Sequence, residues 1–422
     1  MNVEVSALGA IIGLVIAIGL IFVKTPPIYG LLIGALIGGL IGGASLSETV
    51  ELMIGGSQGM VTAILRILAA GVLAGVLIKS GAAESIARTI IKKIGEKKAL
   101  FALALATLLL TSVGVFIDIA VITVAPIALN IAKNASISRS SILLAMIGGG
   151  KAGNVISPNP NTIAVSEAFD TPLTSVMLAG VIPAFFALFV TYFIARYLST
   201  KDPSVELKEI EEEQNLSDLP NFWASISGPI TAVILLSLRP IAGIVIDPMI
   251  ALPLGSIIGS IIMGEFKGII DQASFGLSKM APVAILLIGT GAIAGIITNS
   301  TLGELLINGV ASLGLPIYLL APISGIVMSG ATASTTSGAI VASSVFSKPL
   351  LESGFSALGG AAMIHAGSTV LDHLPHGSFF HSTGGSVGMA FKERLKLIPY
   401  ESAVGFVIMT VSVIMYGLLN LG

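Results

Sequence analysis

The chain has 422 residues, of which 54% are hydrophobic and only 10% are charged. Soluble domains carry about 25% charged residues, so this composition, with a mean hydropathy of +0.99, predicts an integral membrane protein. The formal net charge of −2 does not indicate a nucleic-acid partner, and the sequence contains no cysteine, which excludes disulfides and cysteine metal sites. The 49 glycines are typical of closely packed membrane helices.

The first half of the chain contains a series of apolar segments near the length of about 20 residues that a membrane span requires. The first segment lacks a basic start and a small-residue cleavage site, so we expect a retained span and not a signal peptide. A basic amphipathic segment, 81–98, is expected along the membrane surface. Residues 99–133 are too long for one span and are interrupted near their middle, which predicts a re-entrant hairpin. The predicted spans of this half are 5–23, 28–45, 60–80, 139–169 and 172–198.

The second half repeats this order after an acidic stretch, 199–222, that is expected to be a polar cytoplasmic linker. The segment AGVLAGVLIKSGAAESI, from Ala70, resembles TGAIAGIITNSTLGELL, from Thr290, at an offset of 220 residues. The surface segment is expected at 300–314 and the second hairpin at 315–350. The predicted spans are 225–245, 248–263, 281–299, 355–388 and 402–421.

Together these patterns predict an all-α membrane protein built from two inverted repeats, 1–198 and 223–422. Each repeat has five spans and one hairpin, and an odd number of spans inverts the second repeat relative to the first. With both termini outside the cell, most of the 21 Lys and Arg residues lie on the cytoplasmic side. Inverted repeats with interrupted helices are typical of secondary transporters, whose substrate binds near the middle of the membrane.

The first interrupted helix lies in 139–169 and contains IGGGKAGNVISPNPNTIAVS. Gly148 to Gly150 are expected to weaken the helix, and Pro158 and Pro160 remove backbone donors. Irregular backbone at membrane depth is tolerated where it lines a cavity, so the polar side chains around this break are predicted to bind substrate. They are Lys151, Asn154, Ser157, Asn159, Asn161 and Thr162.

The second interrupted helix lies in 355–388 and contains HAGSTVLDHLPHGSFFHS, where Pro375 and Gly377 break the helix. It holds all four histidines of the chain. A metal site is not favoured, because Pro375 disrupts the helical spacing that the neighbouring acid and imidazoles would need. Substrate contacts are predicted at Ser368, His376 and Ser378. Ion coupling is predicted at Asp372, His373 and His376, while His365 and His381 are expected to serve packing or gating.

The hairpins supply the remaining candidates. Asp118, in the first hairpin, is an ionisable group inside the membrane and therefore a candidate for ion coupling. The second hairpin carries a run of hydroxyl groups that suits a carboxylate or hydroxylated substrate, although a tight seam of small residues is the alternative. This run contributes Ser334, Thr335, Thr336 and Ser337.

Several charged residues lie within predicted spans or at their ends. Lys151 can pair with Asp118, attract an anionic substrate, or form a static ion pair. Arg66 is expected to be structural, either reaching the membrane surface or paired with an acid. Glu167, with Asp170, is expected to be a solvated carboxylate at the outer end of its span.

The order of FIDIAVITVAPIALNIAKNASIS, SPNPNTIAVS, SGATASTTSGAIVAS and LDHLPHGSFFHS resembles the gluconate:proton symporter (GntP) family of the ion-transporter superfamily. The resemblance covers both repeats. It implies uptake of gluconate or another small hydroxylated organic acid with protons, and a homodimer whose protomers have a scaffold part and a mobile part. Where the family's first broken helix carries a Pro-Pro-His-Pro type of run, this chain has Ser157-Pro158-Asn159-Pro160.

We therefore expect a secondary transporter in a prokaryotic plasma or inner membrane that imports a small organic anion by proton symport, without a cofactor. One alternative is sodium-coupled carboxylate symport. Another is cation/proton antiport on the same scaffold, with Asp118 and Asp372 binding the cation. Neither an H-E-x-x-H motif nor a nucleophile elbow occurs in the sequence, which argues against an enzyme.

Overall fold

The computed structural model describes residues 4–23, 25–95, 98–135, 137–201, 219–302, 316–375 and 377–422, with single positions between 303 and 315. These residues form helices joined by short turns, with an isolated bridge between Val5 and Ser300. The prediction of an all-α protein is confirmed. Most of the linker and of the surface segment at 300–314 lies outside the described residues.

The first half forms helices α1 to α11. They are α1 (Ala7–Phe22), α2 (Pro27–Ile41), α3 (Leu46–Gln58), α4 (Val61–Lys79), α5 (Ala82–Ile94), α6 (Ala99–Ser112), α7 (Ile117–Ala135), α8 (Arg139–Asn154), α9 (Pro160–Ala168), α10 (Leu173–Ala179) and α11 (Val181–Lys201).

The second half begins with α12, after the linker. Its elements are α12 (Phe222–Ala242), α13 (Pro248–Met263), η3 (Phe266–Gly268), α14 (Ile269–Thr298), η4 (Ile317–Leu319), α16 (Leu320–Thr332), α17 (Thr335–Glu352), α18 (Ala357–Ser368), α19 (Ser378–Ser386), α20 (Phe391–Leu395), α21 (Ile398–Ser412) and the π-helical η5 (Val413–Leu418).

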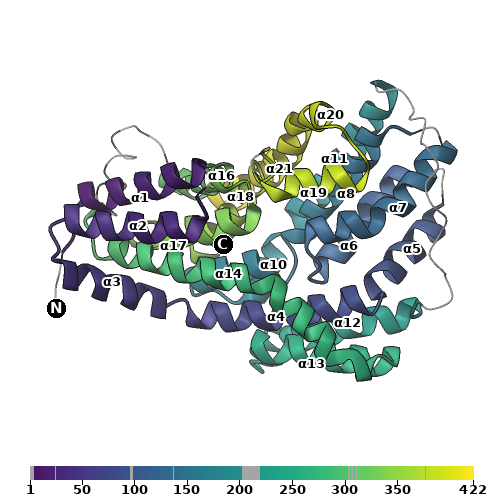
Figure 1. Cartoon of the computed structure of the whole chain (residues 1–422), viewed down its shortest axis with the longest axis horizontal. Helices are drawn as coiled ribbons and strands as arrows, with labels where there is room; N and C mark the ends of the chain where they lie inside the picture. The colour runs from purple at the N-terminus through teal and green to yellow at the C-terminus, as the bar shows by residue number, and fades with distance from the viewer. Residues whose placement is uncertain are drawn as a thin grey trace.

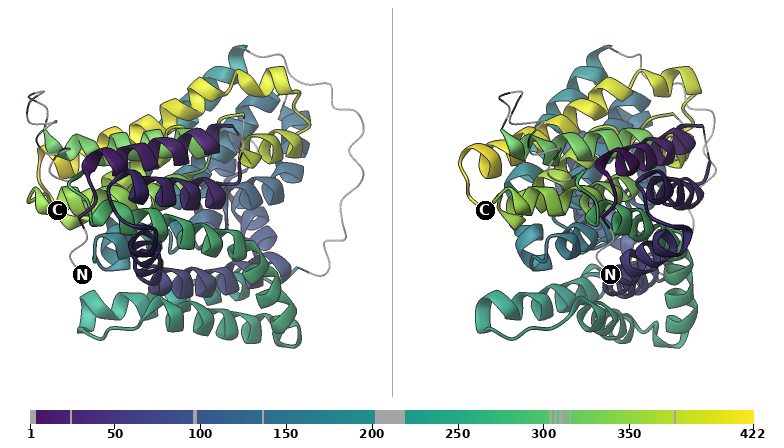
Figure 2. Two further views of the ribbon diagram at one scale, coloured as in Figure 1. Left: turned by 60° about the vertical axis from the view of Figure 1, so that its left-hand side comes forward. Right: turned by 90° about the vertical axis from the view of Figure 1, so that its left-hand side faces the viewer.

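The helices are arranged in an elongated body (Figure 1). α1 to α3 lie at one end with α16 and α17, and α5 to α8 lie at the other. Figure 2 shows the α12–α13 hairpin as an outer layer. α19 lies against α7, and α9 lies against α17, so each interrupted helix meets the hairpin predicted in the opposite half of the chain.

Several predicted boundaries are wrong. α3 is not among the predicted segments, although Ser45 and Glu48 form the capping box that starts it. α14 begins at Ile269, not at 281, and continues through Pro282, because a proline within a helix removes only one hydrogen bond. The predicted span 172–198 is divided at Gly180 into α10 and α11.

The glycines of the first broken helix also act differently from the prediction. Gly148, Gly149 and Gly150 lie inside α8, which continues to Asn154. They allow close packing: a Cβ at Gly149 would lie 2.0 Å from the carbonyl oxygen of Ala104. The break therefore falls later, between α8 and α9, where the prolines prevent a continuous helix.

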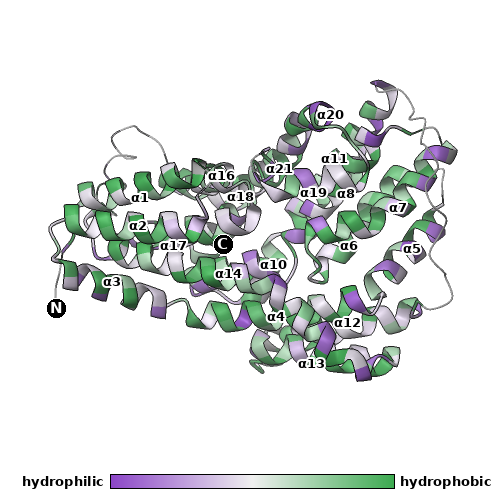
Figure 3. Ribbon diagram, viewed as in Figure 1, coloured by the Kyte–Doolittle hydropathy of each residue, from purple (hydrophilic) through white to green (hydrophobic). Residues whose placement is uncertain are grey.

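Hydrophobic residues predominate along most of the helices (Figure 3). Within the described residues, four helical segments are long and apolar enough to cross a membrane. Large apolar side chains of α11 are exposed, including Phe185 at 65% and Phe189 at 56%. An apolar surface of this extent suits contact with lipid. The four segments are Val61–Lys79, Leu173–Lys201, Phe266–Thr298 and Phe391–Leu418.

Candidate functional site

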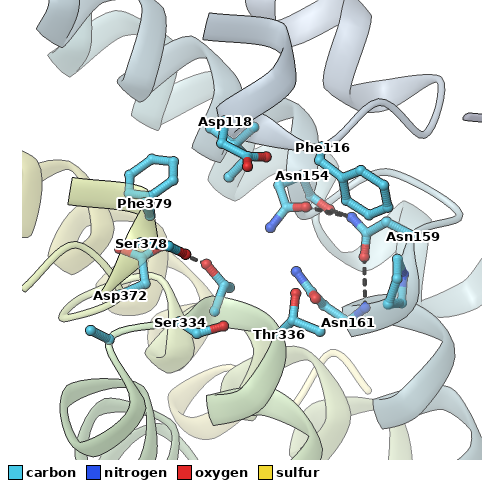
Figure 4. Close-up of a pocket in the computed structure, with 14 residues that line it drawn as sticks. Phe116, Asp118, Asn154, Asn159, Asn161, Ser334, Thr336, Asp372, Ser378 and Phe379 are labelled. Carbon is cyan, nitrogen blue, oxygen red and sulfur yellow. Dashed lines mark hydrogen bonds between the residues drawn. The ribbon is translucent and has the colours of Figure 1, made fainter. Parts of the chain in front are cut away.

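A cavity of about 190 Å³ lies between the two interrupted helices and the two hairpins (Figure 4). Its lining residues come from four widely separated parts of the chain, 116–118, 154–161, 333–336 and 372–379. The lining residues are Phe116, Ile117, Asp118, Asn154, Asn159, Pro160, Asn161, Ala333, Ser334, Thr335, Thr336, Asp372, Ser378 and Phe379.

Helix starts form much of the wall. α7 begins at Ile117, α9 at Pro160, α17 at Thr335 and α19 at Ser378, and all four residues or their neighbours line the cavity. The N-terminus of a helix carries partial positive charge and free backbone N–H groups. Four such ends around one small volume make an environment that favours an anion.

The break after α8 is held by Asn159. Its side-chain oxygen accepts hydrogen bonds from the backbone N–H of Asn161 at 2.9 Å and of Thr162 at 3.1 Å, so it caps α9. Its amide nitrogen donates to the backbone and side-chain oxygens of Asn154, both at 2.6 Å. Asn159 therefore fixes the relative position of the two halves of the first interrupted helix.

Two amide groups at the cavity remain without protein partners among the described residues. They are the side-chain nitrogen of Asn154 and the side-chain oxygen of Asn161. Asn154 is only 6% exposed and Asn161 only 3%. A buried polar group without a partner is costly, so these two groups are available to hydrogen-bond a molecule in the cavity.

The turn of the second hairpin supplies hydroxyl groups. Ser334 caps α17, its oxygen accepting from the N–H of Ser337 at 3.2 Å, and Ala333 before it has the left-handed φ of 46°. Figure 4 shows Ser334 and Thr336 across the cavity from Asp118. The sharp turn points the hydroxyl-bearing start of α17 toward the cavity.

Asp372 reaches the cavity, but its charge is already balanced. Its carboxylate oxygens lie 2.6 Å from the ammonium of Lys151 and 2.5 Å from the hydroxyl of Thr335. Lys151 is fully buried behind the cavity wall. The suggested pairing of Lys151 with Asp118 is therefore wrong: α8 points the ammonium toward the break after α18, where carbonyl and carboxylate oxygens receive it.

The predicted substrate contacts divide into two groups. Asn154, Asn159, Asn161, Ser334, Thr335, Thr336 and Ser378 line the cavity, together with the coupling candidates Asp118 and Asp372. Lys151, Ser157, Thr162, Ser337, Ser368 and His373 do not line it. His376 lies outside the described residues.

Phe116 and Phe379 were not predicted as site residues, although both line the cavity. Each lies at a helix start, Phe116 before α7 and Phe379 in the first turn of α19. Their closeness in the sequence to the candidates Asp118 and Ser378 could have indicated that they line the site. Within the described residues, no group of three or more His, Asp and Glu side chains could hold a metal ion. His381, outside the cavity, donates its Nε2–H to the carbonyl of Pro375 at 2.8 Å.

A second polar cavity, of about 230 Å³, lies where α4, α9 and the start of α13 meet. Arg66 forms ion pairs there with Glu167 and Asp247. The structural role expected for Arg66 is thus supported by its contacts, but Glu167 is a paired carboxylate and not a freely solvated one. Partial burial alone would raise the pKa of Asp247, but hydrogen bonds from Arg66 and from the N–H of Met249 outweigh it and lower that pKa.

Comparison with known proteins identifies the family. The chain matches the GntP family permease profile over residues 1–421. The chain belongs to the GntP permease family. It is a multi-pass inner-membrane permease and not an enzyme.

Individual proteins similar to this GntP permease are also named as transporters or permeases. It is 62% identical over 415 residues to an uncharacterised transporter of Haemophilus influenzae, covering 98% of both chains. It is 26% identical to a gluconate permease of Pseudomonas aeruginosa, covering 95% of both, and 23% identical to a high-affinity gluconate transporter of Escherichia coli, covering 87% of this chain and 88% of the other.

The fold of this permease is also found in a solved structure. The YdaH transporter of Alcanivorax borkumensis matches with a TM-score of 0.65 and 16% identity, over 88% of each chain. At this identity the comparison shows a shared transporter fold alone.

Proposed function

We propose that this permease imports a small hydroxylated organic anion, such as a sugar acid, together with protons. The observation that carries this proposal is the meeting of the starts of α7, α9, α17 and α19 at one cavity. Their partial positive charges attract a carboxylate, although no Lys or Arg is among the described residues that line the cavity. A volume of about 190 Å³, below the roughly 300 Å³ of pockets for drug-sized ligands, suits a small metabolite.

Hydroxyl recognition is supported by the side chains at the cavity. Thr336 and Ser378 present hydroxyls, and the free amide groups of Asn154 and Asn161 offer a donor and an acceptor. A site built to hydrogen-bond hydroxyl groups discriminates against analogues that lack them, because its own polar groups are then left unpaired. The relatives named as gluconate permeases support a sugar acid as the substrate class.

We assign coupling to Asp118. Asp372 is balanced by Lys151, whereas Asp118 has no ion-pair partner among the described residues. An ionised Asp118 would repel an anionic substrate by about 2–3 kcal/mol at a separation of roughly 6 Å and an effective dielectric constant of about 20. Protonation removes this repulsion, so proton and anion binding favour each other.

The arrangement in the membrane belongs to the same proposal. Two inverted repeats, 1–198 and 223–422, would move the anion by alternating access, with both termini outside and the linker 199–222 in the cytoplasm. The interrupted helices and hairpins would form the mobile part of each protomer of a homodimer.

The test is uptake of labelled gluconate into proteoliposomes under an imposed pH or sodium gradient. We expect accumulation with the pH gradient alone. Accumulation that requires sodium would support the sodium-coupled alternative, and cation exchange without anion uptake would support an antiporter. Asp118→Asn should retain exchange of gluconate but lose proton-driven accumulation, whereas the exposed control Asp271→Asn should behave as the wild type.

A further inference from the structure

The ammonium of Lys151 lies in a cage of acceptors. Its Nζ is 2.6 Å from the carbonyl oxygen of Thr369, 2.6 Å from Oδ1 of Asp372, 3.1 Å from Nδ1 of His373 and 3.5 Å from the carbonyl oxygen of Glu401. An ammonium group has three protons, and three oxygens that can only accept surround it: Oδ1 of Asp372 and the carbonyl oxygens of Thr369 and Glu401. The cage is formed by the break after α18 and by α21, while the lysine enters from α8.

His373 borders the cage, and both of its ring nitrogens make polar contacts. Its Nδ1 lies 3.1 Å from Nζ of Lys151 and 2.9 Å from Oδ1 of Asp372. Its Nε2 lies 3.0 Å from the carbonyl oxygen of Ile398 and 3.1 Å from Oγ of Ser402. The imidazole thus belongs to the same hydrogen-bond network as the ammonium and the carboxylate, while the oxygens of the cage come from Thr369, Asp372 and Glu401.

The cage has the chemistry of an alkali-cation site. Thr369 is the C-cap of α18, so its carbonyl oxygen lies at the negative end of that helix. Carbonyl oxygens at the C-terminal ends of broken helices, joined by a carboxylate, coordinate sodium in secondary transporters. In this chain, the ammonium of Lys151, which cannot dissociate from the protein, occupies a cage with these ligand types.

We propose that Lys151 is a tethered cation that occupies a sodium-type site formed by Thr369, Asp372 and Glu401. A sodium-coupled carrier binds a sodium ion from solution, whereas here the positive charge is the ammonium of Lys151 in α8. It neutralises Asp372 in every state in which the cage is intact, so that among the described residues lining the cavity the net charge changes only at Asp118. This inference deepens the proposed proton coupling and rests on it for that consequence, but the cation site itself can be tested without transport.

The experiment measures the Tm of the purified full-length protein in sodium chloride and in choline chloride at equal ionic strength. The wild type should have the same Tm in both salts. Lys151→Ala leaves room in the cage, so its Tm should be lowered in choline chloride and should rise with sodium concentration, as expected when an ion binds the folded state. Lys151→Met fills the room without a charge, and its Tm should be low in both salts.

The matched control is Lys79→Ala, which removes an exposed lysine from the last turn of α4, as Lys151 lies in the last turn of α8. This variant should show no sodium response. A sodium response in the wild type would overturn the proposal, because the cage would then not be filled by the lysine. An equal Tm of Lys151→Ala in both salts would also overturn it.

The proposal can also be tested if Lys151→Ala does not fold in choline chloride. If Lys151→Ala cannot be purified in either salt while Lys151→Ala/Asp372→Asn can, sodium has not replaced the ammonium and the proposal is wrong. Recovery of Lys151→Ala only in sodium supports it. Uptake assays keep the two proposals separate: a wild type that needs sodium for gluconate uptake refutes proton coupling, whereas the Tm series alone decides whether Lys151 fills a cation site.

Discussion

Arg66 of α4 forms an ion pair with Glu167 in the last turn of α9, and the same guanidinium binds Asp247 at the start of α13. One side chain thus joins the end of the first interrupted helix to two helices outside it. The three side chains are about a quarter to a third exposed, so each pair is partly screened and its contribution to stability is modest.

The Arg66 cluster predicts a dependence of stability on pH. The pKa of Asp247 is lower in the folded protein than its usual value of about 3.9. The resulting stabilisation is complete above that value and is lost as the pH falls through the lowered folded-state pKa. As the pH falls below about 4, the Tm of the wild type should fall more steeply than that of Arg66→Gln. The control Arg88→Gln removes an i,i+4 pair with Glu84 and should leave the slope unchanged; equal slopes for Arg66→Gln and wild type would contradict the prediction.

Two adjacent glycines of α3 should respond oppositely to alanine. A Cβ at Gly56 would lie 2.1 Å from the carbonyl oxygen of Gly291 in α14, whereas a Cβ at Gly55 would meet nothing within 4 Å. Gly56→Ala should destabilise the protein by about 1–3 kcal/mol through overpacking. Gly55→Ala should be neutral or stabilise by up to about 1 kcal/mol, because alanine favours helix. Thermal unfolding of both variants in the same detergent checks the difference, and equal Tm values would show that α3 and α14 do not pack this closely.

Asn161→Ala should weaken substrate binding without destabilising the fold. The side-chain oxygen of Asn161 has no hydrogen-bond partner among the described residues, so its removal breaks no side-chain bond of the folded protein. Loss of one hydrogen bond to the substrate should raise the KM for gluconate uptake by roughly tenfold, or about 1.4 kcal/mol. Asn299→Ala, at the end of α14, is the control and should keep the wild-type KM. An unchanged KM in Asn161→Ala would remove this residue from the substrate site.

Removing one partner of the buried pair Arg394 and Glu401 should destabilise the protein more than removing both. Both side chains are almost fully buried, and Arg394 also donates to the carbonyl of Phe380 at 3.3 Å. Arg394→Met should cost about 3–5 kcal/mol, because it leaves the Glu401 carboxylate buried and unpaired. The double variant Arg394→Met/Glu401→Met should recover part of that loss. A double variant less stable than the single one would show that the pair itself stabilises the fold.

The sequence determined the class of protein and the places where its helices break. A chain with so few charges can cover its apolar segments only with lipid or with other helices. The closely spaced Pro158 and Pro160, and Pro375 two residues before Gly377, disfavour a continuous helix more strongly than the single prolines inside helices such as Pro282 of α14. For the same reason, the polar residues next to the breaks could be chosen as site candidates, and Asn154, Asn159, Asn161 and Ser378 do line the cavity.

Only the tertiary structure decided which of these groups meet. Lys151 is close in the sequence to Asn154 but contacts Asp372, 221 residues away, because the direction of a side chain on α8 depends on the helix that packs against it. The same holds for the four helix starts at the cavity and for Arg66 with Asp247. Local sequence determines where a helix begins. The partner of a buried charge depends on long-range packing and cannot be predicted from the spacing of residues along the chain.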